Sequence, residues 1–144
     1  MKTITKFELK KSPTDFKKVR ITCADDSVKY IRQFYLDDIE VYESSFILLL
    51  NRNNDTIGYA KISQGGITGT VVDVKIIAKY CVDSLASGVI LAHNHPSGNL
   101  NPSVQDKEIT YKIKEALKML DTILYDHVIL TADNFYSFVE NELL

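Results

Sequence analysis

The residues best suited to chemistry lie close together, between His93 and Asp106. Two histidines two positions apart are followed by a serine eight residues after the second, and by an aspartate three residues after that serine. Zinc in proteins is bound by imidazole nitrogen and carboxylate oxygen, and a catalytic zinc has three protein ligands with a fourth position left for water. His93, His95 and Asp106 are therefore predicted to bind one Zn²⁺ ion.

The chain around the histidines can aim both side chains at one point. Residues 88–92 are apolar and predict a buried strand that ends at His93. Alternate residues of an extended chain point the same way, so His93 and His95 share one side while Asn94 turns aside. Pro, Ser and Gly at residues 96–98 then break the strand into a loop.

A helix is predicted after this loop, because the apolar positions 109, 113, 116, 117 and 120 share one face. Asp106 lies in its first turn, with its carboxylate directed back toward the strand end. The pair Ser103 and Asp106 also fits a capping box, and alone it favours that simpler interpretation, because caps are far commoner than metal sites. The joint pattern favours a metal, since two of the three histidines occupy this one spacing directly after a predicted core strand.

The pattern His-x-His, seven residues, Ser-x-x-Asp resembles the JAMM signature of the JAB/MPN metallopeptidases. The segment ILAHNHPSGNLNPSVQD, with DHVIL at residues 126–130 and YSFVENELL at the end, resembles the bacterial RadC family in particular. The resemblance covers residues 40–144 and implies a zinc metallopeptidase of JAMM type.

The resemblance also implies two catalytic groups. Family members have a glutamate at the start of an upstream strand, which acts as general base on the attacking water. Matching residues 46–51 to that strand places Glu43 there, with Glu40 as the alternative. Taken without the family, Glu43 would only solvate a strand entrance. Ser103 resembles the family serine whose hydroxyl stabilises the oxyanion, and the implied reaction is metal-assisted hydrolysis of a peptide or isopeptide bond.

Three other interpretations of the histidines are weaker. The letters HNH at residues 93–95 do not indicate an HNH nuclease, whose namesake residues are dispersed along the chain. The zinc deaminases need H-x-E and P-C-x-x-C, and neither motif is present. His127 fits the RadC pattern and could support the site from behind, but a lone histidine leading an apolar strand is more often structural, so it is not predicted to be a ligand.

Composition predicts one small domain with a basic N-terminal arm. The chain has 144 residues, 45% of them hydrophobic, which is enough for a single core. We expect an arm over residues 1–24 and a RadC-like JAB/MPN catalytic domain over 25–144. Cys23 and Cys81 have no metal or redox spacing, and no signal peptide or membrane span is evident, so a cytoplasmic location is expected.

Charge gives little general attraction to nucleic acid, because 17 basic and 19 acidic residues leave a net charge of −2. The arm is a local exception. Its first twenty residues carry the cations Lys2, Lys6, Lys10, Lys11, Lys17, Lys18 and Arg20, against only Glu8 and Asp15. Such a run is usually a solvated segment, although it could contact phosphate.

The expected element order is mixed α/β. Strands are expected near residues 3–9, 41–50, 57–63, 88–92 and 123–131, with a last extended segment at 135–138. Helices are expected at about 27–36 with Asp26 as cap, at 74–85 with Asp73 as cap, and after Ser103. These elements predict a three-layer αβα sandwich with a mixed sheet, and the JAB/MPN resemblance implies the same cytidine-deaminase-like fold.

Three functional hypotheses follow. The first is a zinc-dependent hydrolase that acts on a peptide or protein substrate. The second is a DNA repair-associated accessory protein, which would bind DNA through the basic arm or bind a repair partner, with a structural metal. The third is a binding scaffold that the metal only stabilises. Substrate and oligomeric state are not encoded in any readable pattern.

Overall fold

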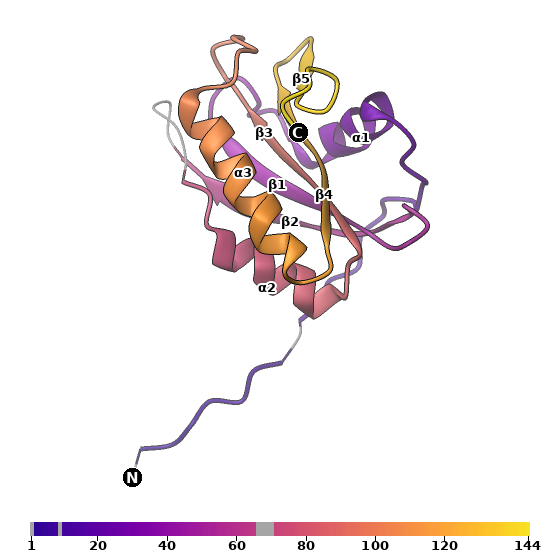
Figure 1. Ribbon diagram of the computed structural model, residues 1–144, viewed down its shortest axis with the longest axis vertical. Coiled ribbons are helices and arrows are strands. Elements are labelled where there is room, and N and C mark those ends of the chain that lie inside the picture. The colour runs from indigo at the N-terminus through magenta and orange to yellow at the C-terminus, as the bar shows by residue number, and fades with distance from the viewer. Residues whose placement is uncertain (1, 9, 66–70) are drawn as a thin grey trace.

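The computed structural model describes residues 2–8, 10–65 and 71–144 (Figure 1). Three α-helices, a single 3-10 turn and five strands occur in these ranges. In chain order they are α1 (Ala24–Ile31), η1 (Arg32–Phe34), β1 (Ser44–Leu50), β2 (Thr56–Gln64), α2 (Val74–Ser84), β3 (Gly88–Asn94), α3 (Val104–Lys118), β4 (Ile123–Leu130) and β5 (Phe135–Ser137).

The strands form one mixed sheet in the order β2-β1-β3-β4-β5. Strands β3 and β4 are parallel, and every other neighbouring pair is antiparallel. Parallel neighbours need a crossover, which α3 supplies. Because β1 runs against β3, the start of β1 lies beside the end of β3, and Ser45 pairs with His93. The start of β1, the end of β3 and the start of α3 therefore meet at one edge of the sheet.

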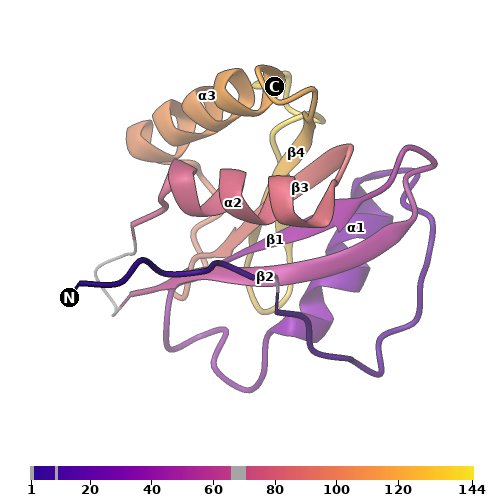
Figure 2. The ribbon, with the colours of Figure 1, turned by 90° about the horizontal axis from the view of Figure 1, so that it is seen from below.

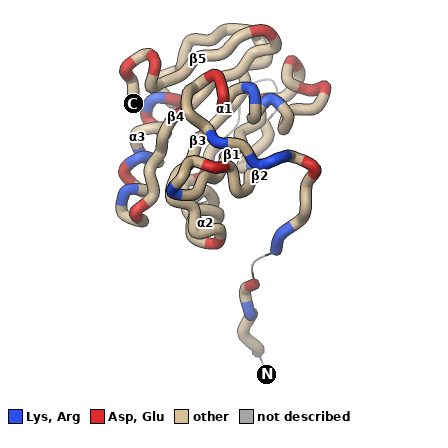
Figure 3. The backbone as a smooth tube through the Cα atoms, turned by 90° about the vertical axis from the view of Figure 1, so that its right-hand side faces the viewer, with Lys and Arg blue, Asp and Glu red and all other residues tan. Residues whose placement is uncertain are grey.

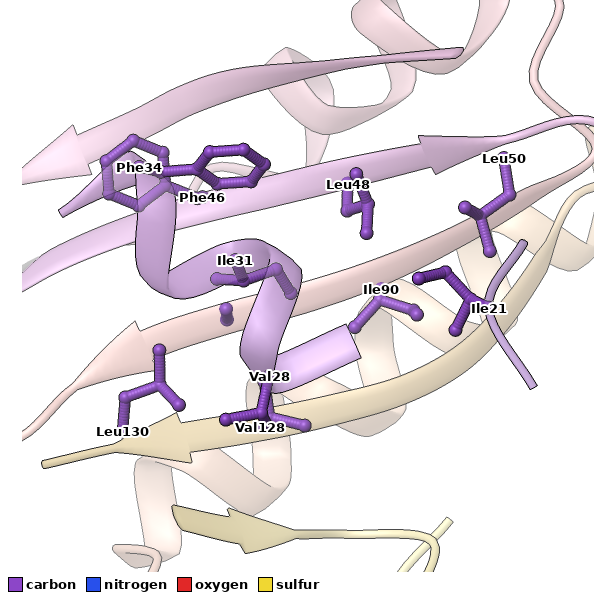
Figure 4. Close-up of a cluster of buried hydrophobic side chains, with 11 residues drawn as sticks. Ile21, Val28, Ile31, Phe34, Phe46, Leu48, Leu50, Ile90, Val128 and Leu130 are labelled. Carbon is purple, nitrogen blue, oxygen red and sulfur yellow. The ribbon is translucent and has the colours of Figure 1, made fainter. Parts of the chain in front are cut away.

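The helices cover both faces of the sheet, which makes the predicted three-layer αβα sandwich. Figure 2 shows α2 and α3 on one face and α1 on the other. Alternate residues of the central strands are buried on opposite faces, as the strand period of two requires. Ile47 and Leu91 pack with Ile113 of α3, whereas Leu48 and Ile90 belong to the cluster under α1 (Figure 4).

Two predicted element starts shift for identifiable reasons, and the first helix, expected to reach residue 36, ends earlier, with α1 at Ile31 and η1 at Phe34. Helix α1 begins at Ala24, and Asp26 is not its cap but lies in its first turn, where its carboxylate accepts hydrogen bonds from the Thr22 amide and hydroxyl. Strand β1 begins at Ser44 and not at residue 41, because the amides of Val41 and Tyr42 both bond back to the Asp38 carbonyl in a turn. The hairpin of β1 and β2 with its five-residue connection at 51–55 is confirmed.

The strand expected near residues 3–9 is wrong for residues 2–8, which have no regular secondary structure; residue 9 lies outside the described residues. A strand needs a partner for its backbone groups, and Figure 3 shows this arm running away from the sheet with its basic residues in blue. The chain joins the domain near Arg20, which bridges to Asp55, and at the buried Ile21. None of the helices in the described ranges has the length and apolar character needed to cross a membrane.

Candidate metal centre

The sheet edge described above gathers two imidazoles and a carboxylate. His93 is near the end of β3, His95 follows that strand, and Glu43 immediately precedes β1. The Nε2 atoms of His93 and His95 are 2.9 Å apart. One ligand atom from each of these three residues lies within 4.8 Å of the other two. Glu40, the alternative base, is exposed in the preceding turn, and the structure places Glu43 beside the imidazoles instead.

Backbone contacts hold His95 with its Nε2 atom facing the cluster. Its amide donates to the Leu130 carbonyl over 2.9 Å, which extends the pairing of β3 with β4 by one residue. Its Nδ1 lies 2.6 Å from the Asn99 carbonyl oxygen. A carbonyl only accepts hydrogen bonds, so Nδ1 carries the proton and Nε2 keeps a lone pair when the ring is neutral.

Asp106 is both a helix cap and a neighbour of the histidines. The Asp106 amide donates to Ser103 Oγ and the Ser103 amide donates to Asp106 Oδ2, which is a complete capping box. The same carboxylate lies 3.3 Å from Nε2 of His93 and 3.4 Å from Nε2 of His95. The cap and the cluster are therefore compatible, because the cap itself directs the carboxylate toward the end of β3.

The electrostatics of the cluster follow from these contacts. Burial raises the pKa of Asp106, but hydrogen bonds from His93 and His95 outweigh burial and hold that pKa well below its usual range. The hydrogen bond to Asp106 raises the pKa of His95 despite its partial burial. A cation bound between these groups would take the place of the imidazole protons in these contacts.

The profile of the family described as RadC-like JAB domain matches residues 21–143. The chain belongs to this family. The JAB assignment agrees with the mixed sheet and its covering helices, and with the position of the histidine pair at the end of β3.

Relatives of this RadC-like JAB chain are named UPF0758 proteins, a name that specifies no reaction. That of Flavobacterium johnsoniae is 50% identical over 99 residues, which cover 69% of this chain and 43% of the relative. That of Porphyromonas gingivalis is 41% identical over 71% of this chain and 45% of the relative. That of Fusobacterium nucleatum is 34% identical over 98% of this chain and 60% of the relative. The chain thus spans about half the length of these relatives.

Asn94, between the two histidines of the RadC-like motif, has a role that the pattern alone does not reveal. Its side chain is fully buried and accepts from the Ser44 amide, while its amide nitrogen donates to the carbonyls of Ile39 and Tyr42. These bonds fasten the turn that carries Glu43 onto β3. One indication of this role was present in the sequence, because a polar residue within a buried strand needs hydrogen-bond partners in the folded protein.

A third imidazole, that of His127, contacts His93 on the side away from His95. Nδ1 of His93 is 2.7 Å from Nε2 of His127, and Nδ1 of His127 is hydrogen-bonded to the Thr110 hydroxyl on α3. His127 is 1% exposed and stacks on Phe138. A ring this buried, with no carboxylate bonded to either nitrogen among the described residues, favours its neutral form, and burial lowers the pKa of His127 well below its usual value. Both of its ring nitrogens are engaged, Nε2 by His93 and Nδ1 by Thr110. Sequence reasoning gave Thr110 no role.

The cluster opens into a cleft of about 920 Å³ that both polar and apolar side chains line. Ser103 and Gln105 on the α3 side and Ser63 and Gln64 at the end of β2 line it. The side chains of His95, Glu43 and Asp106 keep 15%, 17% and 18% of their surface exposed, so a molecule in the cleft can reach them. The geometry therefore offers nitrogen and oxygen donors at the bottom of an accessible cleft.

Proposed function

We propose that this chain is a zinc-dependent metallohydrolase of JAMM type that cleaves a peptide or isopeptide bond. The main support is the convergence of two imidazole nitrogens and two carboxylates on one point of the cleft. Imidazole nitrogen and carboxylate oxygen are the donors that zinc takes in catalytic sites. Two lone pairs facing each other at 2.9 Å are unfavourable unless a proton or a cation lies between them, so the donor set fits a divalent ion.

The two carboxylates differ in ways that support separate roles. Asp106 lies within 3.4 Å of both imidazoles and is held in place by the capping box, which suits a ligand. Glu43 Oε1 is 3.8 Å from His95, and among the described residues no hydrogen bond holds its carboxylate. A carboxylate that is free to take and return a proton suits a general base. We therefore assign His93, His95 and Asp106 to the metal and Glu43 to proton transfer.

A bound zinc ion would lower the pKa of a water molecule and polarise the scissile carbonyl. Glu43 accepts a proton from the attacking water while the water oxygen forms a bond to the carbonyl carbon. Glu43 then returns that proton to the leaving amine as the C–N bond breaks. The oxygen of Ser103 accepts from the Asp106 amide, so its hydroxyl proton remains available to the developing oxyanion.

The test is Glu43→Gln, which keeps the shape of the side chain but removes the base. We expect zinc content to match the wild type and hydrolysis of a peptide and isopeptide library to fall about 100-fold or more. Glu40→Gln is the matched control, because this exposed glutamate is three residues away, and it should behave as the wild type does. Equal activity of wild type and Glu43→Gln across the library would exclude this mechanism.

We also propose DNA association through the arm as a second function, supported by the exposed lysines of residues 2–8 and 10–15. Phosphate contacts make affinity fall steeply with salt. Deleting residues 1–15 leaves Phe16 in place, which packs this segment on the domain through its contacts with Phe34 and Tyr59. We expect binding of a labelled DNA duplex by the full chain to weaken as salt is added. The chain that lacks residues 1–15 should bind the duplex more weakly than the full chain at the same salt concentration. No measurable binding at low salt would contradict the proposal.

A further inference from the structure

The proposed reaction leaves two buried groups unexplained, His127 on β4 and Thr110 on α3. They are 1% and 2% exposed and form a line behind His93. Successive contacts join His93 Nδ1 to His127 Nε2, and His127 Nδ1 to Thr110 Oγ1. The Thr110 hydroxyl also lies 2.6 Å from the Asp106 backbone carbonyl. His127 is among the residues that line the cleft beside the cluster, whereas Thr110 is not.

Which atom donates and which accepts in each of these hydrogen bonds follows from the number of protons available. Thr110 has one hydroxyl proton, and the Asp106 carbonyl can only accept it. Toward His127, Thr110 Oγ1 must then act as acceptor, so the proton of the neutral His127 ring is on Nδ1. Its Nε2 is left with a lone pair, which requires a proton on Nδ1 of His93.

We infer that Thr110 and His127 are positioning residues that fix the proton of His93 on Nδ1 and leave its Nε2 lone pair free to bind the metal ion. This inference rests on the metal centre of the proposed function. His95 reaches the same state through the Asn99 carbonyl, so the two imidazoles are prepared by different partners. A ligating histidine commonly donates its other N–H to a carboxylate or a carbonyl, and here a neutral imidazole replaces that group without adding negative charge.

Reversing the donor and acceptor roles in these hydrogen bonds shows why the Thr110 hydroxyl matters. If its proton pointed to His127 Nδ1, the His127 proton would lie on Nε2 and would be donated to His93 Nδ1. The proton of His93 would then be on Nε2, in the position that the metal needs. Bonding of Thr110 to the Asp106 carbonyl disfavours this arrangement, so a single hydroxyl on α3 determines which nitrogen of His93 can be a ligand.

The experiment combines nitrogen-15 NMR of the histidine rings with zinc titration of the folded chain. In metal-free wild type, His127 should show a protonated Nδ1 and an unprotonated Nε2. Thr110→Val keeps the side-chain shape but removes the acceptor, and we expect zinc affinity to fall about 10- to 100-fold. Thr110→Ser restores the hydroxyl and should return both the affinity and the ring signals to wild-type values. Circular dichroism checks that both variants are folded.

The outcomes separate this inference from the proposed reaction. A wild-type His127 protonated on Nε2 overturns it without any variant, as does Thr110→Val binding zinc as tightly as the wild type. Zinc binding that depends on the Thr110 hydroxyl, in a chain that hydrolyses no peptide, supports the inference and contradicts only the peptidase. Wild type that binds no zinc overturns both.

Discussion

The Ser103 hydroxyl can perform two tasks at once because its oxygen and its proton act separately. The oxygen accepts from the Asp106 amide over 3.0 Å and caps α3. The proton remains for a substrate oxyanion in the cleft that Ser103 lines. In the proposed reaction, stability and catalysis would therefore depend on different atoms of one group, and substitutions can separate them.

We expect Ser103→Ala to lower the free energy of unfolding by about 1 kcal/mol, because an alanine cannot cap the helix. Ser103→Gly should lower it by only a few tenths of a kcal/mol, since glycine is tolerated at this position. Both variants lose the hydroxyl, so both should reduce hydrolysis by about the same factor, on the order of 100. Urea denaturation and kcat for one library substrate provide the two measurements. An activity loss that followed stability and differed between alanine and glycine would assign Ser103 to the cap alone.

The turn before β1 is the element that sets the position of Glu43, and Asn94 holds it. Three hydrogen bonds of 2.6 to 2.8 Å connect this one side chain to Ile39, Tyr42 and Ser44. The turn is thus tied to β3, the strand that carries His93. The position of Glu43, the proposed base, relative to the imidazoles depends on this buried amide as much as on the pairing of β1 with β3.

We expect Asn94→Ala to destabilise the fold by about 2–4 kcal/mol, because it leaves one buried amide and two carbonyls without partners. Hydrolysis should fall by a larger factor than zinc affinity, since Glu43 is displaced while His93 and His95 keep their own contacts. Asn101→Ala, at an exposed asparagine, is the control and should change stability by less than about 0.5 kcal/mol. Thermal unfolding, zinc titration and hydrolysis of one library substrate measure the three quantities, and equal losses of activity and zinc affinity would contradict this role.

Elements with strong local signals were predictable, and contacts between distant residues were not. The apolar periodicity of α2 and the capping residue Asp73 predicted a helix over 74–85, and it spans Val74–Ser84 with Asp73 accepting from the Lys75 amide. Asp26 was a misleading signal, because adjacent acids at 25 and 26 fit either a cap or a first turn. The deciding hydrogen bonds come from Thr22, only four residues earlier, so this error is local: the helix begins at Ala24 and not after Asp26.

The same limit applies to the cluster. The spacing of His93 and His95 after an apolar run gave their shared direction, because the strand period is a local property. Asn94 bonds to a residue 50 positions away, and Thr110 to one 17 positions away, so no local pattern contains these pairs. Family resemblance pointed to Glu43, which residue types alone would have assigned to solvation.

At the scale of the whole molecule, the two cysteines differ in burial, so their rates of modification distinguish the closed domain from one whose core has opened. Cys23 is exposed, whereas Cys81 is 2% exposed in the core between α2 and the sheet. Burial raises the pKa of Cys81 to about 11, so at pH 8 only about one thousandth of it is thiolate, the reactive form. Modification of Cys81 therefore requires the core to open.

We expect one fast equivalent of thiol reagent per native chain, lost in Cys23→Ser, and a slow second reaction at Cys81. In Cys23→Ser, zinc at about 100 times its dissociation constant should slow that second reaction by up to about 100-fold, because an ion that binds only the folded state lowers the open population by this factor. His95→Ala in the same background removes one proposed ligand and should show no such slowing. If zinc slowed labelling equally in both chains, it would be acting on the thiol directly and not through the centre. Slowing that requires His95 would link the stability of the entire core to the ion at the end of β3.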